Sequence, residues 1–137
     1  MYITLGVSRV LFRPIVYFKV TPGKLEAQVM GTTTYTAVVS KGLSHPRSLM
    51  GDFSAVETCM KEAIIKLGLK GWLKRAPVIL THLIPEVEGC YTNVELRAFR
   101  EAAFGAGAAQ SWLLANHPPL SPHDVSEIKK HFGKSLL

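Results

Sequence analysis

One stretch of the sequence, residues 77–118, constrains the fold more than any other. It begins with an apolar run between prolines, PVILTHLIP, which is typical of an interior strand of a covered sheet. The segment TNVELRAFREAAFGAGA follows, and its apolar residues recur at helical spacing. A second short apolar run, QSWLLANHPP, closes the stretch. The order of these three segments predicts one β-α-β unit.

The two ends of the helix in this stretch are marked by capping residues. Thr92 and Glu95 stand three residues apart, which fits a capping box that satisfies the free amides of the first turn. Gly105 and Gly107 are expected to stop the helix. The residues expected to face the core are Leu96, Phe99, Ala103 and Phe104.

Three short apolar segments upstream predict an antiparallel meander. Residues 15–20 form the first strand, which ends at the turn signal TPG. Residues 25–30 alternate between apolar and polar side chains and form the second strand, and residues 35–39 supply the third. The segment 41–50 then reads as a surface connection.

A further helix is predicted between the meander and the β-α-β unit. Ser54 and Glu57 have the spacing of a capping box at its start, and Gly68 is expected to end it. Apolar residues at helical spacing predict a buried stripe of Val56, Cys59, Met60, Ala63, Ile64 and Leu67. The exposed face is predicted to carry two ion pairs four residues apart, Glu57–Lys61 and Glu62–Lys66.

Two connecting segments carry further expectations. Trp72 lies in the basic segment 69–75, where it either folds under the sheet or faces a partner, and a buried or half-buried indole is the commoner outcome. Ser121 before a proline is expected to open a last helix. Its core-facing residues would be Val125, Ile128 and Phe132.

Two segments together resemble the MreB-type bacterial actins. The segment HPRSLMGDFSAVETCMKEAI is similar to the R-P-x-x-x-G-x-x-x-D-F pattern of those proteins and the helix after it. The segment TNVELRAFREAAFGAGA, with its flanking strands, resembles their T-x-V-E-x-R-A-x-x-x-A-A-x-x-A-G-A pattern. The resemblance covers residues 45–118, roughly half of the chain, and implies an actin-like fold of the ribonuclease-H type.

With this resemblance, the expected fold class is α/β, a ribonuclease-H-like or actin-like ATPase subdomain. It would consist of a three-stranded antiparallel meander followed by α-β-α-β and a C-terminal helix. We expect residues 15–137 to form this single MreB-like subdomain and residues 1–14 to form an apolar and basic N-terminal extension. A chain of 137 residues is long enough for one domain with a real core.

The resemblance also implies that the ATPase residues of the actin family are lost. The first phosphate loop of the family has the form D-x-G-T-x-x-T, and its best counterpart is a degenerate loop containing Lys19, Thr21, Gly23 and Lys24. Lys19 replaces the aspartate that organises the metal, and the proline of this loop removes one amide donor. An alternative register places residues 4–8 at the loop, which again contains no aspartate.

The second catalytic acid of the family comes from a glutamate-glutamate-proline sequence. Asn116 and His117 stand at the matching positions, and the family's second phosphate loop and adenosine pocket lie beyond the matching region. We therefore expect no catalytic residue, no ATPase activity and no nucleotide cofactor. The histidines of the chain lack metal-ligand spacing, so no metal site is predicted.

The formal net charge of +6 points to anionic partners, namely lipid head groups, nucleic acid or an acidic protein, with a solvated surface as the alternative. The candidates for contact with a partner or a membrane are Arg9, Phe12, Arg13, Lys70, Trp72, Lys74 and Arg75. Residues 1–14 either lie on a membrane as an amphipathic segment or pack on the protein. They lack the features of a secretory signal, and no apolar run of the chain reaches the length of a membrane span.

The two cysteines are far apart and form no paired motif. Cys59 is expected to be a small core residue. Cys90 is expected in the turn before a helix, where the helix dipole can lower a thiol pKa, but no base can be assigned to it. This cysteine usage favours a reducing cytoplasm, with peripheral contact at the inner membrane face as a further expectation.

Three functions follow from these features. The first is a non-catalytic MreB-like protein, a structural or regulatory binding module linked to cell shape or the cytoskeleton. Its partner would be a second copy or a full-length bacterial actin. The second is a small nucleotide-binding protein that uses the degenerate phosphate loop. In that case, substitution of Lys19 or Lys24 would abolish nucleotide binding. The third is a basic nucleic-acid-binding domain, which is least favoured because no recognition motif is present.

Overall fold

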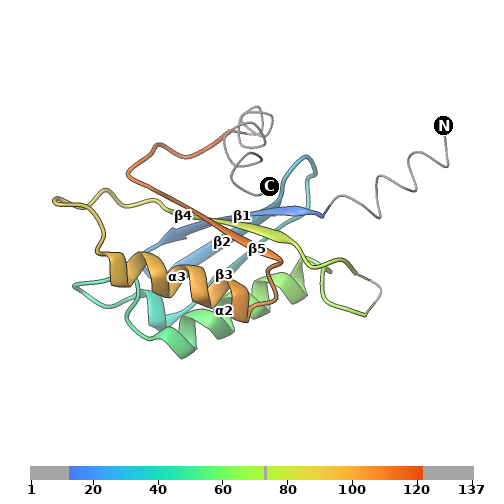
Figure 1. Ribbon diagram of the computed structural model, residues 1–137, viewed down its shortest axis with the longest axis horizontal. Helices are drawn as coiled ribbons and strands as arrows, with labels where there is room; N and C mark the ends of the chain where they lie inside the picture. The colour runs from blue at the N-terminus through green and yellow to red at the C-terminus, as the bar shows by residue number, and fades with distance from the viewer. Residues whose placement is uncertain (1–12, 73, 122–137) are drawn as a thin grey trace.

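The strands predicted from the alternating segments join one mixed sheet, and two helices pack on one of its faces (Figure 1). This computed structural model describes residues 13–72 and 74–121. The strands are β1 (Ile15–Thr21), β2 (Lys24–Val29), β3 (Tyr35–Val39), β4 (Val78–Leu83) and β5 (Gln110–Ala115). The helices are the short η1 (Lys41–Leu43), α2 (Phe53–Lys66) and α3 (Asn93–Gly105).

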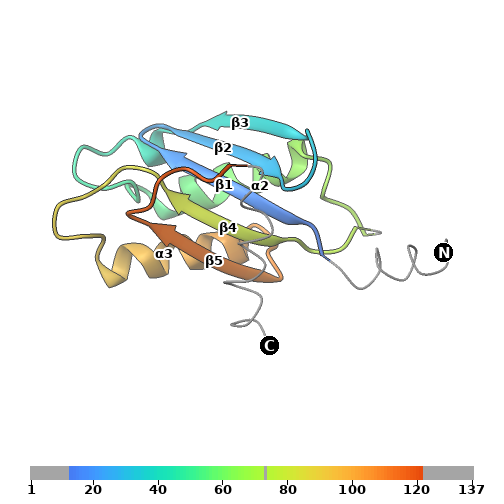
Figure 2. The ribbon, with the colours of Figure 1, turned by 90° about the horizontal axis from the view of Figure 1, so that it is seen from above.

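The central strand of the five-stranded sheet is β1, and the strand order is β3-β2-β1-β4-β5 (Figure 2). β1 pairs antiparallel with β2, and β2 pairs antiparallel with β3, which confirms the predicted meander. β4 pairs parallel with β1, and β5 pairs parallel with β4. Parallel neighbours need a crossover connection, and α2 and α3 provide the two crossovers. The predicted β-α-β unit is therefore confirmed.

The main core lies between the sheet and the two helices. Alternate residues of β1, Val16, Phe18 and Val20, point to this side and are fully buried. The predicted stripe of α2 is buried along its whole length, and α3 buries Phe99 together with two alanines. Both helices cover this face, which holds the larger apolar cluster, and a smaller cluster of Tyr17, Val78, Leu80 and Trp112 lies on the other face.

Local helix signals are confirmed in part. The capping box of α3 forms, since the Thr92 hydroxyl accepts from the Glu95 amide and the Glu95 carboxylate accepts from the Thr92 amide. The capping box predicted for α2 is wrong. Asp52 is the N-cap, and its carboxylate accepts from the amide of Ala55 at 3.1 Å. The ion pairs of α2 form as predicted, Glu57–Lys61 at 3.3 Å and Glu62–Lys66 at 3.5 Å.

The physical reason for the earlier start of α2 is a close approach of its first turn to η1. A Cβ atom at Gly42 would lie 2.7 Å from the Ala55 side chain, so only glycine fits there. The amide of Gly51 also donates to the Gly42 carbonyl at 2.9 Å. These contacts place Asp52 immediately before the first residue of α2, and aspartate is among the residues most favoured at the N-cap.

One predicted core residue of α3 is not in the core. Phe104 is 45% exposed, whereas Ala102, which was not predicted to be buried, is fully buried. The helix therefore presents Phe99, Ala102 and Ala103 to the sheet rather than the face that contains Phe104.

The α/β class is thus established for the described residues. The predicted last helix and most of the N-terminal extension, including Arg9 and Phe12, lie outside these residues. Among residues 13–72 and 74–121, the helices are too short or too polar to cross a membrane.

Candidate functional site

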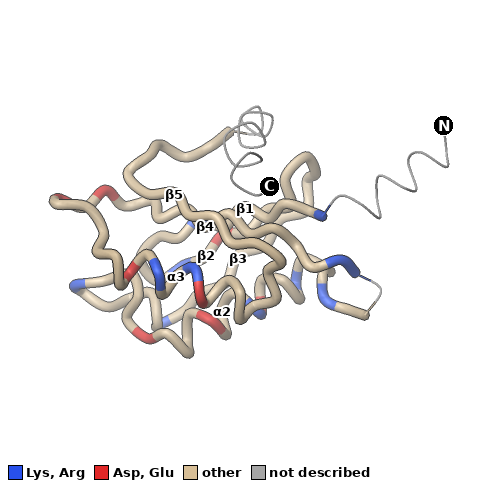
Figure 3. Tube along the Cα trace, viewed as in Figure 1, with Lys and Arg blue, Asp and Glu red and all other residues tan. Residues whose placement is uncertain are grey.

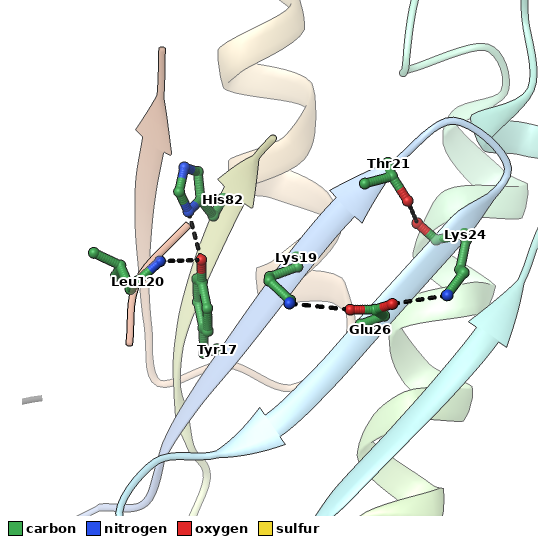
Figure 4. A network of polar contacts seen from close by, with 7 residues as sticks. All are labelled: Tyr17, Lys19, Thr21, Lys24, Glu26, His82 and Leu120. Atoms are coloured by element: carbon green, nitrogen blue, oxygen red, sulfur yellow. Dashed lines mark hydrogen bonds and ion pairs between the residues drawn. The ribbon is translucent and has the colours of Figure 1, made fainter. Parts of the chain in front are cut away.

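The face of the sheet opposite the helices carries the polar side chains of the central strands. Tyr17, Lys19 and Thr21 alternate with the core residues of β1 and point to this side (Figure 4). In the parallel pairing with β4, Lys19 lies beside His82. The segment predicted to be a degenerate phosphate loop is therefore the end of a hairpin that borders the carboxyl end of β4.

The two lysines of this loop share one carboxylate. Lys19 Nζ lies 3.2 Å from Glu26 Oε2, and Lys24 Nζ lies 2.7 Å from Glu26 Oε1. Lys19 and Glu26 face each other across the β1–β2 pair, which explains why they meet. The hydrogen bond from Lys24 is the main reason that the pKa of Glu26 is lowered, and the same bond raises the pKa of Lys24. Glu26 is thus held as a charged partner of two lysines.

The turn of the hairpin offers little to a phosphate group. Pro22 has no amide hydrogen, and the Gly23 amide donates to the Leu43 carbonyl at 2.9 Å. Gly23 has a φ of 77°, a left-handed conformation that glycine adopts without strain. The Thr21 hydroxyl is turned toward the Lys24 carbonyl at 3.5 Å. The amides that would cradle a phosphate are therefore absent at Pro22 and already bonded at Gly23.

Asn116 and His117, which were predicted to stand in place of the second catalytic acid, directly follow β5 and lie near the β1–β2 hairpin. Asn116 has a φ of 54°, and its side-chain oxygen accepts from the Val87 amide at 3.5 Å. The His117 carbonyl accepts a hydrogen bond from His82 Nε2 at 2.8 Å. The structure thus places Lys19, His82 and His117 close together. The carboxylate of this region is Glu26, which is paired with Lys19 and Lys24.

His82 is a central residue of this neighbourhood that the sequence reasoning missed. It is fully buried, and its Nδ1 atom lies 2.6 Å from the Tyr17 hydroxyl. The Tyr17 oxygen in turn accepts from the Leu120 amide at 3.2 Å. A histidine inside the mostly apolar run VILTHL was the available signal, because a buried imidazole needs hydrogen-bond partners.

The hydrogen bonds assign one protonation state to His82. A carbonyl can only accept, so Nε2 carries the hydrogen and donates to His117, while Nδ1 accepts from Tyr17. Burial is the main reason that the pKa of His82 is lowered. Both ring nitrogens are occupied by these bonds. The imidazole consequently has no lone pair free to act as a general base, and it anchors the segment after β5 to the sheet.

Metal binding also lacks support in this region. Within residues 13–72 and 74–121, no group of three or more histidine, cysteine or acidic side chains is arranged to hold a metal ion. Glu86 and Glu88, which follow β4, are both exposed. The described polar set can therefore position chain segments through hydrogen bonds, but it lacks the clustered carboxylates that metal-assisted phosphate chemistry needs.

A second region, at the opposite end of the sheet, collects basic side chains around an exposed indole. Arg13 Nη1 donates to the Ala76 carbonyl at 3.1 Å, which brings the start of the described chain against the loop before β4. Trp72 is 92% exposed, so the expectation of a buried or half-buried indole is wrong. We define the Trp72 surface as Arg13, Lys70, Trp72, Lys74 and Arg75. Figure 3 shows lysines and arginines gathered at this end of the chain trace.

The Trp72 surface borders a shallow cavity of about 340 Å³. Its apolar lining comes from Ile64, Leu69 and Pro77, and Lys70 and Lys74 stand at its margin. Leu69 packs against the main core and covers this end of it, whereas Trp72 makes no such contact. The indole therefore stays exposed. The surface therefore combines an aromatic ring, aliphatic groups and several cations.

The cysteines lie where they were expected. Cys59 is buried in α2, and this burial raises the pKa of its thiol to about 11, so the thiol is protonated and unreactive at neutral pH. Cys90 is exposed and has a φ of 65° in the turn before α3.

Comparison of the sequence with protein-family models finds no match, and comparison with curated proteins finds none either.

Proposed function

We propose that this chain is a non-catalytic, MreB-like binding module that attaches to an anionic membrane surface as a structural or regulatory part of a cytoskeleton. The observation that carries the proposal is the Trp72 surface, in which the Arg13–Ala76 hydrogen bond joins two basic segments distant in sequence. The element order, three antiparallel strands followed by α-β-α-β, is the order expected of an actin-like subdomain and supports the kinship.

The chemistry of the Trp72 surface suits the boundary between water and lipid. Tryptophan prefers this boundary because its ring is apolar and its N–H is polar. Each lysine or arginine near an anionic leaflet contributes about 1 kcal/mol of binding free energy at moderate salt. The exposed Lys70 and Lys74 beside the exposed indole, together with Arg13, supply the charge and the apolar area that reversible attachment needs.

Sedimentation with lipid vesicles tests this proposal. The full chain should bind vesicles that contain phosphatidylglycerol and should not bind vesicles of phosphatidylcholine alone. Substitution of both Lys70→Gln and Lys74→Gln should weaken binding roughly 30-fold, since about 2 kcal/mol is lost. The control is Lys24→Gln with Lys61→Gln, which makes the same change in net charge away from the Trp72 surface. Equal loss in the two double variants would show that only total charge matters and would reject the site.

The absence of ATPase function is a separate part of the proposal. It rests on Lys19 in place of the aspartate, on the bonded amide of Gly23, and on Asn116 and His117 in place of the acids. Titration calorimetry with Mg-ATP and Mg-GTP should give no binding heat. Micromolar binding that is lost in Lys19→Ala or Lys24→Ala would instead favour the nucleotide-binding alternative. Binding of duplex DNA with a steep salt dependence, and not of vesicles, would favour the nucleic-acid alternative.

A further inference from the structure

The edge strand β3 carries no protection of the kind that isolated edges usually have. It lies at the end of the strand order, and its sequence YTAVV contains no charge, proline or glycine. Tyr35 is 54% exposed and Val39 is 81% exposed. Natural proteins usually protect exposed edges with lysines, prolines or bulges, because an open edge is a template for another strand. An uncharged edge of this kind is open to pairing with a further strand.

The direction of the free backbone groups on β3 follows from its pairing with β2. The Ser40 amide donates to the Gly23 carbonyl at 3.0 Å, and the Val29 amide donates to the Thr34 carbonyl at 3.0 Å. Hydrogen-bonded pairs recur at every second residue of an antiparallel ladder, so Thr36 and Val38 also direct their backbone groups toward β2. Tyr35, Ala37 and Val39 therefore direct their N–H and C=O groups outward.

These three outward-facing residues are self-complementary. In an antiparallel pair centred on Ala37, Tyr35 of one chain faces Val39 of the other, and the two copies of Ala37 face each other. Every hydrogen-bonding pair in this register joins two outward-facing residues, as the ladder requires. The register also forms two aromatic–aliphatic cross-strand pairs, which are among the favourable ones. The small alanine at the centre avoids a clash on the symmetry axis.

We propose that β3 is a homodimerisation edge, on which a second copy of this chain adds its own β3 antiparallel about a two-fold axis at Ala37. The sheet of one copy then continues into the sheet of the other. This inference goes beyond the proposed function and does not depend on membrane binding or on kinship to actins.

A groove with charged residues of both signs lies beside the edge. It has a volume of about 430 Å³ and lies between β3 and α2. Its charged lining residues are Lys41, Asp52 and Glu62. A two-fold axis at Ala37 brings the two copies of this groove to the same side of the continued sheet, so each copy adds one cation and two carboxylates to that side.

Analytical ultracentrifugation of the full chain over a range of concentrations tests the dimer. We expect a reversible monomer–dimer equilibrium, which Val39→Lys weakens about tenfold or more, because each dimer loses both Tyr–Val pairs and places a charged lysine opposite each Tyr35. The matched control is Val94→Lys on α3, since Val94 is 77% exposed and lies away from the edge. A monomer at all concentrations, or a dimer equally affected by both variants, would overturn the proposal.

Cysteine cross-linking tests the register independently of affinity. In a Cys90→Ser background, Ala37→Cys should form an intermolecular disulfide under mild oxidation, since directly opposed strand residues lie about 5.5 Å apart between Cα atoms. Val94→Cys in the same background should not cross-link at a comparable rate. Equal rates for the two variants would overturn the two-fold register, as would an open series of higher oligomers in the ultracentrifuge.

Discussion

The two faces of the sheet are built from the same strands and differ in what holds them together. Toward α2 and α3, Val16, Phe18 and Val20 of β1 join a single apolar core. On the other face, the intervening residues Tyr17 and Lys19 make a buried hydrogen-bond relay and a surface ion pair. The second face also holds a smaller apolar cluster of Tyr17, Val78, Leu80 and Trp112, so the helix-covered side depends on packing, whereas the other side combines packing with satisfied polar groups.

The largest effect is expected on the helix-covered face. Phe99 is fully buried, so Phe99→Ala should lower the free energy of unfolding by about 3–5 kcal/mol because it leaves a cavity in the core. Urea denaturation measures this change. Phe104→Ala on the same helix is the control, and it should cost less than about 1 kcal/mol because that ring is 45% exposed. Similar losses in the two variants would show that the apolar core does not dominate α3.

A smaller effect is expected from the relay on the other face. Tyr17→Phe keeps the ring but removes the oxygen that bonds His82 Nδ1 and the Leu120 amide. We expect a loss of about 1–3 kcal/mol in unfolding free energy, since two polar groups lose their partner. Tyr35→Phe, at a ring that is 54% exposed, serves as the control and should be close to neutral. Equal stability of Tyr17→Phe and the unsubstituted protein would contradict the relay.

One buried side chain on the helix-covered face is polar. Thr81 is fully buried on β4, and its hydroxyl has no hydrogen-bond partner among the described residues. Thr81→Val keeps the shape and removes the unpaired group, so it should raise the unfolding free energy by about 1 kcal/mol. Thr36→Val, at a half-buried position of the edge strand, provides the comparison. A destabilised Thr81→Val protein would indicate that the hydroxyl is bonded in solution.

The smallest effect is expected from the titration of His82. Its pKa is lowered in the folded protein, mainly by burial, although the hydrogen bond to the His117 carbonyl acts in the opposite direction, and the charge of Lys19 lowers the pKa further. The unfolded chain therefore binds more protons below about pH 6.5, and stability is lost as the pH falls through this value toward the folded pKa. Above about pH 6.5 the contribution is fully present.

Urea denaturation at about pH 7.5 and about pH 5.5 measures this dependence. The comparison variant is His82→Gln, whose side-chain amide can still donate to the His117 carbonyl but does not titrate. The unsubstituted protein should lose more stability between the two pH values than the variant. The same pH dependence in both proteins would assign the effect to other histidines.

Sequence reasoning succeeded where the signal was local or periodic. The strand segments, the buried stripe of α2 and the Thr92–Glu95 capping box were all predicted correctly. It failed at Ser54, because the closer fit of α2 against Gly42 moved the N-cap to Asp52. It failed at Trp72 as well, because aliphatic residues already cover that end of the core. His82 was missed because its partners Tyr17 and Leu120 are distant in sequence.

The amino-acid sequence by itself thus determined which segments become strands and helices, since periodicity and capping act between residues a few positions apart. Only the tertiary structure decided which strand is the edge, that Arg13 meets the Trp72 loop, and that His82 anchors the segment after β5. These features depend on contacts between residues as many as 103 positions apart, and the order of strands in the sheet brings such residues together.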